Sequence, residues 1–393
     1  KGKIVSSFER DRVRAFQLYF EAYEKSKNDV SSGKDRFKLI IAFADFIMNK
    51  GESWRFQELT DLSTLPDYEE RVGGYWRGYR GNSIMAPVDS EGNPIFYSIP
   101  ASFADAKSDG ERWRFLLNEA EALNPEWKHY AEMEYAEFLV SQFGVQTIAR
   151  FPVYGVNNLD EDWDSISNAY PVHTLGEDET IARLATGIKR FKLPDEHNYI
   201  KIFRNISKDT SSKESAVSAL ERLSEIFKNR RQYIKAADCL KAIVDLNPTY
   251  LRRYIKELNQ IIGDWGEFIP SENFPAGKNP SLRIRYRNAK FASFDAFELK
   301  ADQIISDVKE YIKSNPKTLQ TERLDLNDIG RRVVMQNESK YIGAKIASWK
   351  VELKPKSGHW DKVQSVEVPF SKPGAYLVIA KFGDGNISRI TLW

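Results

Sequence analysis

The side chains that most often carry chemistry are scarce in this chain of 393 residues. It has a single cysteine, Cys239, and its four histidines are His129, His173, His197 and His359. The histidines have no paired spacing that suggests a metal site, and one cysteine cannot form an internal disulfide. The sequence also has no phosphate-binding glycine-rich motif and no Gly-x-Ser-x-Gly elbow. It therefore predicts no catalytic residue, no metal site and no cofactor.

One acidic loop resembles the start of a calcium loop. Asp160, Asp162 and Asp164 alternate as calcium ligands do, but such a loop next needs a glycine and, six residues later, a glutamate. Ser165 and Pro171 occupy those two positions. We interpret the segment as a solvated acidic loop, with a weak cation site as the alternative.

A second acidic group begins a segment that we predict to be a helix. Thr174 and Glu177 fit a capping box, and apolar residues recur at helical spacing over 174–192. Those apolar residues are Ile181, Leu184, Ile188 and Phe191. Acidic residues gather at positions 177–179 and basic ones at 189–192, which would complement the helix dipole. This explanation needs no catalytic role for the carboxylates.

The composition indicates a globular protein of two or three domains. Hydrophobic residues make up 41% and aromatic residues 13% of the chain. It has 58 basic and 56 acidic side chains, for a net charge of +2. Residues 73–82, GGYWRGYRGN, could suggest RNA binding, but the balanced charge favours an ordered surface insertion and no nucleic-acid partner. No apolar run is long enough to span a bilayer.

The chain begins without a methionine and without an apolar signal core. Its first residues, KGKIVSSFERDRVRAFQLYFEAYEK, already show helical spacing. We therefore expect a piece of a longer protein, from which any targeting signal is missing.

Residues 1–262 are predicted to form helical hairpins. Amphipathic helices are expected at 8–25 and 37–48, and helices resume after Ser108. Between them, residues 84–99 read as a small β-hairpin with its turn at 89–93. Residues 216–248 resemble a tetratricopeptide repeat, because small Ser224 and Ala236 allow two helices to approach and Pro248 ends the second. Cys239 would then be a buried structural thiol.

Residues 263–393 are predicted to form a second, β-rich domain after an aromatic, Pro- and Gly-rich linker that begins at Gly263. Residues 281–287 alternate cleanly, with Leu282, Ile284 and Tyr286 on one face, and residues 289–300 are expected to pair with them. Further strands end in a hairpin around Gly-Asp-Gly-Asn at 383–386. Short strands at this spacing indicate an antiparallel β-sandwich. One inserted helix near 301–314 should bury four apolar residues, Ile304, Ile305, Val308 and Ile312.

The ending VEVPFSKPGAYLVIAKFGDGNISRITLW is similar to the first macroglobulin-type domain of large bacterial alpha-2-macroglobulin-like proteins. Upstream segments also resemble the helical N-terminal region of that family: LTDLSTLPDYEE, APVDSEGNPIFY, KSDGERWR, HTLGEDETIARLATGIKRFKLPDE and IGDWGEF. The resemblance covers nearly the whole chain. It implies a tetratricopeptide-like module followed by the first of several sandwiches.

The resemblance implies a part in a protease trap. In this family a protease cleaves a bait segment and is then enclosed, and many members add a thioester made from a cysteine and the glutamine three residues later. Ala242 stands three residues after Cys239, so no thioester is expected here. We expect a non-catalytic fragment with protein partners, in a secreted, periplasmic or cell-surface protein. Two alternatives are an envelope scaffold without trapping and an enzyme whose site is assembled from scattered residues.

Overall fold

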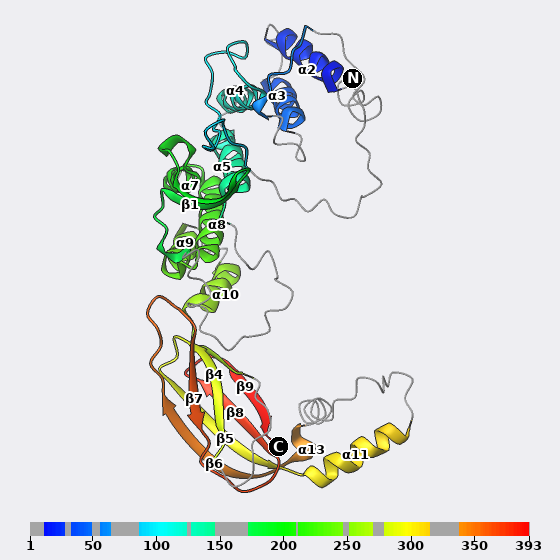
Figure 1. Ribbon diagram of the computed structural model, residues 1–393, viewed down its shortest axis with the longest axis vertical. Coiled ribbons are helices and arrows are strands. Elements are labelled where there is room, and N and C mark those ends of the chain that lie inside the picture. Colours follow the sequence, from blue (N-terminus) through cyan, green and yellow to red (C-terminus); the bar gives the residue numbers. More distant parts are fainter. Residues whose placement is uncertain are drawn as a thin grey trace. The chain divides into compact units, whose positions relative to one another are not determined.

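The computed structural model describes residues 12–27, 33–48, 56–63, 86–123, 127–145, 172–209, 211–246, 251–269, 279–314 and 338–392. Within these ranges the chain is an α+β protein, with most of its helices in the first part and antiparallel sheets later (Figure 1). Its contacts define two compact units, Lys1–Leu246 and Asn247–Trp393. This division lies upstream of the predicted boundary between residues 262 and 263.

The first unit consists mainly of helices, and each packs on the next. They are α2 (Arg12–Ser26), α3 (Gly33–Met48), α4 (Asp109–Leu123), α5 (Tyr130–Phe143), α7 (Tyr199–Lys208), α8 (Lys213–Asn229) and α9 (Tyr233–Leu246). Two short 3-10 helices, η6 (Val172–Thr174) and η7 (Asp195–His197), join them. The helices predicted for the described parts of 8–25, 37–48 and the stretch after Ser108 are confirmed. Pro248 and Phe8 lie outside the described residues.

Local hydrogen bonds explain where several helices begin and end. The Asn198 side chain accepts hydrogen bonds from the N–H groups of Ile200 and Lys201 and so caps α7. Helix α8 ends where Arg231 adopts a left-handed φ of 55°. There the N–H of Gln232 donates to the Phe227 carbonyl at 2.8 Å, as in a Schellman motif.

The helix predicted for residues 174–192 is wrong. The segment forms an antiparallel hairpin, β1 (Glu179–Leu184) and β2 (Gly187–Lys192), whose turn uses Gly187 at a φ of 122°. The acidic and basic residues do pair, but across the hairpin: Arg190 binds Glu179 at 2.7 Å and Lys192 binds Asp178 at 2.9 Å. The spacing of the apolar residues indicated a helix because β1 is covered on both faces. Its residues therefore lack the apolar–polar alternation expected of a strand with one exposed face.

The predicted hairpin at 84–99 is only partly present. Its turn exists, because Asp89 accepts hydrogen bonds from the N–H groups of Glu91 and Asn93. Within residues 86–99, however, the flanking runs form single bridges, and one of them joins Ala86 in parallel to Leu184 of β1. The segment therefore extends the β1–β2 sheet.

The second unit contains two antiparallel sheets. One has the order β3-β4-β7 and the other β6-β5-β8-β9. The strands are β3 (Trp265–Phe268), β4 (Ser281–Arg287), β5 (Phe291–Leu299), β6 (Ile342–Glu352), β7 (Lys362–Glu367), β8 (Tyr376–Phe382) and β9 (Ile387–Leu392). The unit also holds the helices α10 (Leu251–Ile262), α11 (Ala301–Lys313) and α13 (Glu338–Tyr341).

The two sheets share one hydrophobic core and so form a sandwich. Leu282, Ile284 and Tyr286 of β4 are buried together with Phe294 of β5 and Phe382 of β8. The alternation predicted for β4 is therefore confirmed, as is the final hairpin β8–β9. Trp393 itself lies outside the described residues.

Two details of the predicted strand order are wrong. Residues 289–300 do not pair with β4, because Asn288, at a φ of 61°, redirects the chain into the opposite sheet. Residues Trp265–Phe268, predicted as linker, form β3. Side chains of the β8–β9 turn and of β9 bind this short strand. Asn386 in the turn bonds both the N–H and the carbonyl of Gly266, at 2.9 and 2.7 Å, and Ser388 of β9 accepts a hydrogen bond from the N–H of Phe268 at 3.1 Å.

Helix α11 is the predicted inserted helix, but it buries less than expected. Ile304 is 2% exposed and packs with Leu299 and Leu377, whereas Ile305 is 48% exposed. Val308 and Ile312 are partly buried. The prediction that all four apolar residues are buried is therefore wrong at Ile305.

Candidate functional site

The chemistry-bearing residues of the sequence do not converge in the described structure. Cys239 is buried in α9, and burial raises the pKa of its thiol to about 11, so it is a protonated packing residue as predicted. The described residues contain no group of three or more His, Cys, Asp or Glu that could hold a metal ion. The acidic loop at 160–164 and the run at 73–82 lie outside those residues.

Arg230 is a buried charged group of the first unit. This side chain is fully buried at the C-terminal end of α8. Its guanidinium donates to the carbonyls of Gly176 and Glu179, at 3.0 and 2.9 Å, and to the Tyr199 hydroxyl, at 2.7 Å. Arg230 therefore joins the α8–α9 turn to the start of β1 and to α7.

Neighbouring side chains strengthen the same junction. Gln232 donates to the Leu175 carbonyl at 2.7 Å. Glu177 accepts two hydrogen bonds from Arg204 and one from Lys235, at 2.9, 2.9 and 2.8 Å. These bonds, those from Arg204 foremost, lower the pKa of Glu177 to about 2. Glu177 thus stays ionised near neutral pH, so it has no proton to donate as a general acid, and its low pKa makes it a weak base.

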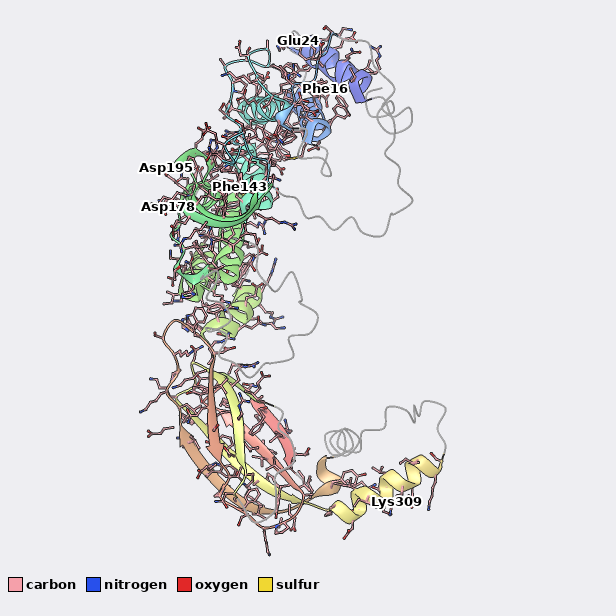
Figure 2. All side chains as sticks on the ribbon, in the orientation of Figure 1. Phe16, Glu24, Phe143, Asp178, Asp195 and Lys309 are labelled. Atoms are coloured by element: carbon pink, nitrogen blue, oxygen red, sulfur yellow. The ribbon has the colours of Figure 1, made fainter. Side chains whose placement is uncertain are left out.

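Two carboxylates near this part of the chain, Asp178 and Asp195, are labelled in Figure 2. Asp178 immediately precedes β1, and Asp195 is the first residue of η7. Asp178 binds Lys192 at 2.9 Å, and Asp195 binds Lys201. Both carboxylates therefore serve ion pairs at the surface, whose contributions to stability are small.

A second polar cluster surrounds His197, whose ring stacks on Phe96 with centroids 4.6 Å apart. The Nδ1 atom of His197 lies 2.7 Å from the Tyr135 hydroxyl. Arg114 lies over the Tyr135 ring, 3.7 Å from its centroid, and donates to Glu196 at 2.9 Å. Burial lowers the pKa of His197 and raises the pKa of Tyr135.

This His197 cluster has the residue types of an acid–base site but not the arrangement. The His197 ring is bonded to the buried Tyr135 hydroxyl, and the neighbouring carboxylate of Glu196 is bound to Arg114. The groups fix η7 against α4 and α5. We therefore interpret the cluster as structural.

Sequence reasoning did not single out the buried polar residues that hold the first unit together. Arg230 stands in the run KNRRQ, which reads as a solvated surface turn. Asp109 is 1% exposed and accepts hydrogen bonds from Thr60 and Arg112. The run SDGE at 108–111 does indicate where α4 begins, since the N–H of Glu111 donates to the Ser108 hydroxyl as in a capping box. It does not indicate that Asp109 is buried.

Comparison with protein-family models found no match, and comparison with curated proteins found no significant similarity. Within the described ranges, every helix is too short or too polar to cross a bilayer.

Proposed function

We propose that this chain is the non-catalytic N-terminal part of a bacterial alpha-2-macroglobulin-like protein and contributes scaffold or partner contacts to a protease trap. The observation that carries the proposal is the two-sheet sandwich that follows the helical unit and includes the predicted β8–β9 hairpin. The sandwich supports a macroglobulin-type domain, and the α8–α9 pair supports a tetratricopeptide-like module.

The buried polar groups also support a scaffold over an enzyme. Two described side chains with clearly shifted pKa values serve internal contacts: Glu177 binds Arg204 and Lys235, and Cys239 is protonated inside α9. Their perturbed pKa values follow from burial and ion pairing without any need for catalysis. Partners would be proteins, and a secreted, periplasmic or cell-surface location follows from the proposed family.

A scaffold of the cell envelope without protease trapping is the second candidate. The successive pairing of α2 with α3, α3 with α4, and α7 with α8 favours it, since stacked helices build extended binding surfaces. The two candidates share a non-catalytic helical module. They differ in whether the longer protein encloses a protease.

The isolated chain tests the non-catalytic part of the proposal. It should neither cleave a panel of peptide, ester and phosphate substrates nor inhibit serine, cysteine or metalloproteases after pre-incubation. Inhibition by the chain alone would place the inhibitory function in the helical unit or the sandwich and would contradict the proposal. A heat-unfolded sample of the same chain serves as the control for non-specific effects.

A further inference from the structure

We propose that His129 is a pH-dependent latch that joins the beginning of α5 to the segment between α7 and α8. Its Nδ1 lies 2.5 Å from a carboxylate oxygen of Glu132, and its Nε2 lies 2.9 Å from a carboxylate oxygen of Asp209. A neutral imidazole carries one ring proton, so only the imidazolium can donate to both carboxylates. Protonation therefore completes a bridge between two segments far apart in the sequence.

The charged groups around the ring favour the cation. Lys128 competes with the ring, because its Nζ lies 2.5 Å from the same Oδ2 atom of Asp209 that His129 binds, whereas Glu132 contacts His129 on the other ring nitrogen. Glu121 of α4 adds a third carboxylate to the surroundings, because it accepts a hydrogen bond from the N–H of Ala131 at 2.8 Å. The positive end of the α5 dipole opposes a charged histidine here, and Glu132 in the first turn offsets that effect.

The backbone supports a role at this position. His129 is the residue before α5 and has a left-handed φ of 69°, a backbone conformation that residues other than glycine rarely adopt. A conformation of this kind persists where surrounding contacts impose it. The bonds to Glu132 and Asp209 are such contacts, so their loss would release the entrance to α5.

The direction of the pH effect follows from the environment of the ring. Burial lowers the pKa of His129, but the hydrogen bonds with Glu132 and Asp209 outweigh it, so that the pKa is raised above its ordinary 6.5. Hydrogen bonds from Lys128, Ser211 and His129 hold the pKa of Asp209 far below its usual range, so Asp209 stays ionised. The stabilisation is fully present below pH 6.5 and is lost as the pH rises through the raised pKa. The latch is closed in acid and opens toward alkaline pH.

An NMR titration of the histidine rings tests the protonation. The chain has four histidines, and His197, with its lowered pKa, is an internal comparison in the same unit. We expect the His129 midpoint above 6.5 and the His197 midpoint below it. Asp209→Asn should lower the His129 midpoint, whereas Asp195→Asn, which removes an exposed carboxylate bound to Lys201, should leave it unchanged. A wild-type His129 midpoint at or below 6.5, or one that Asp209→Asn does not move, would overturn the proposal.

Amide hydrogen exchange tests the conformational consequence. After correction for the intrinsic pH dependence of exchange, protection of the segments around His129 and Asp209 should fall through the His129 midpoint. The fall should be at most about tenfold for each unit by which the pKa is raised. His129→Gln should show low protection with no such pH dependence. Wild-type protection that stays constant across the midpoint would overturn the latch even if His129 titrates above 6.5.

Discussion

Replacing Arg230 with methionine should destabilise the first unit strongly. Methionine can occupy the space of the arginine stem, but it removes the Arg230 donor from the carbonyls of Gly176 and Glu179. The Gly176 carbonyl keeps a longer hydrogen bond from the Glu179 N–H, at 3.3 Å. The Tyr199 hydroxyl keeps a weaker alternative, since Thr180 Oγ1 lies 3.4 Å away. Each buried carbonyl left unpaired costs about 1–3 kcal/mol, while removal of a buried charge offsets part of that loss. We therefore expect a loss of about 2–4 kcal/mol.

Thermal unfolding of the whole chain, followed by circular dichroism at a helix-sensitive wavelength, measures this loss. For a unit of this size, 2–4 kcal/mol corresponds to a fall in Tm of roughly 5–15 °C. Arg222→Met is the matched control, because Arg222 lies on the same helix but is part-exposed and paired with Glu137 and Glu225. It should change stability by about 1 kcal/mol or less. Equal Tm values for the two variants would refute the assignment of Arg230 as the residue that holds β1 to the α8–α9 turn.

Three further changes test other parts of the structure. Ala236 is fully buried where α8 meets α9, so Ala236→Leu should overpack that contact and cost about 1–3 kcal/mol; an unchanged denaturation midpoint would mean that the helices do not approach there. A Cβ at Gly266 would collide with the Phe382 ring, so Gly266→Ala should lower the Tm of the sandwich, and a Tm equal to wild type would contradict the packing of β3. Glu177, with its pKa lowered to about 2, contributes stability that is complete above pH 4.5 and lost as the pH falls toward 2; Glu177→Gln should flatten that part of the pH–stability curve, and an unaltered curve would contradict its pairing with Arg204.

The elements predicted best were those that bury one face only, because their apolar residues then recur at the spacing of a strand or a helix. Strand β4 alternates because one face meets the core and the other meets solvent, so Leu282, Ile284 and Tyr286 could be assigned directly. Helices α8 and α9 carry apolar faces at helical spacing, and small Ala236 marks their approach. In these cases local pattern and tertiary packing agree.

The errors arose where tertiary contacts remove the local pattern. Strand β1 has Thr180, Ile181 and Ala182 buried in succession, so its spacing could not be told from that of a helix. The paired charges of residues 177–192 fit both a helix dipole and a hairpin, since both bring acidic and basic side chains into favourable positions. The order of the strands could not be predicted from the sequence either. The turn at Asn288 could lead into a tight hairpin or into another sheet, and long-range strand pairing decides between the two.

Polar residues inside the first unit were the hardest to foresee. Arg230 and Asp109 are of types that almost always lie at the surface, and only their specific partners make burial possible. Those partners come from segments distant in the sequence, such as Gly176 for Arg230 and Thr60 for Asp109. No local signal reports such a pairing.

The proposed part in a protease trap is tested most directly with the longer protein that the proposal implies and one protease assayed on two substrates. After pre-incubation, cleavage of a large protein substrate should be strongly retarded while cleavage of a small peptide substrate continues, because an enclosed protease is shielded by size. The isolated chain, with the same protease, should affect neither substrate. Equal inhibition of both substrates by the longer protein would indicate an active-site inhibitor, and no inhibition of either would contradict the trap and favour the envelope scaffold.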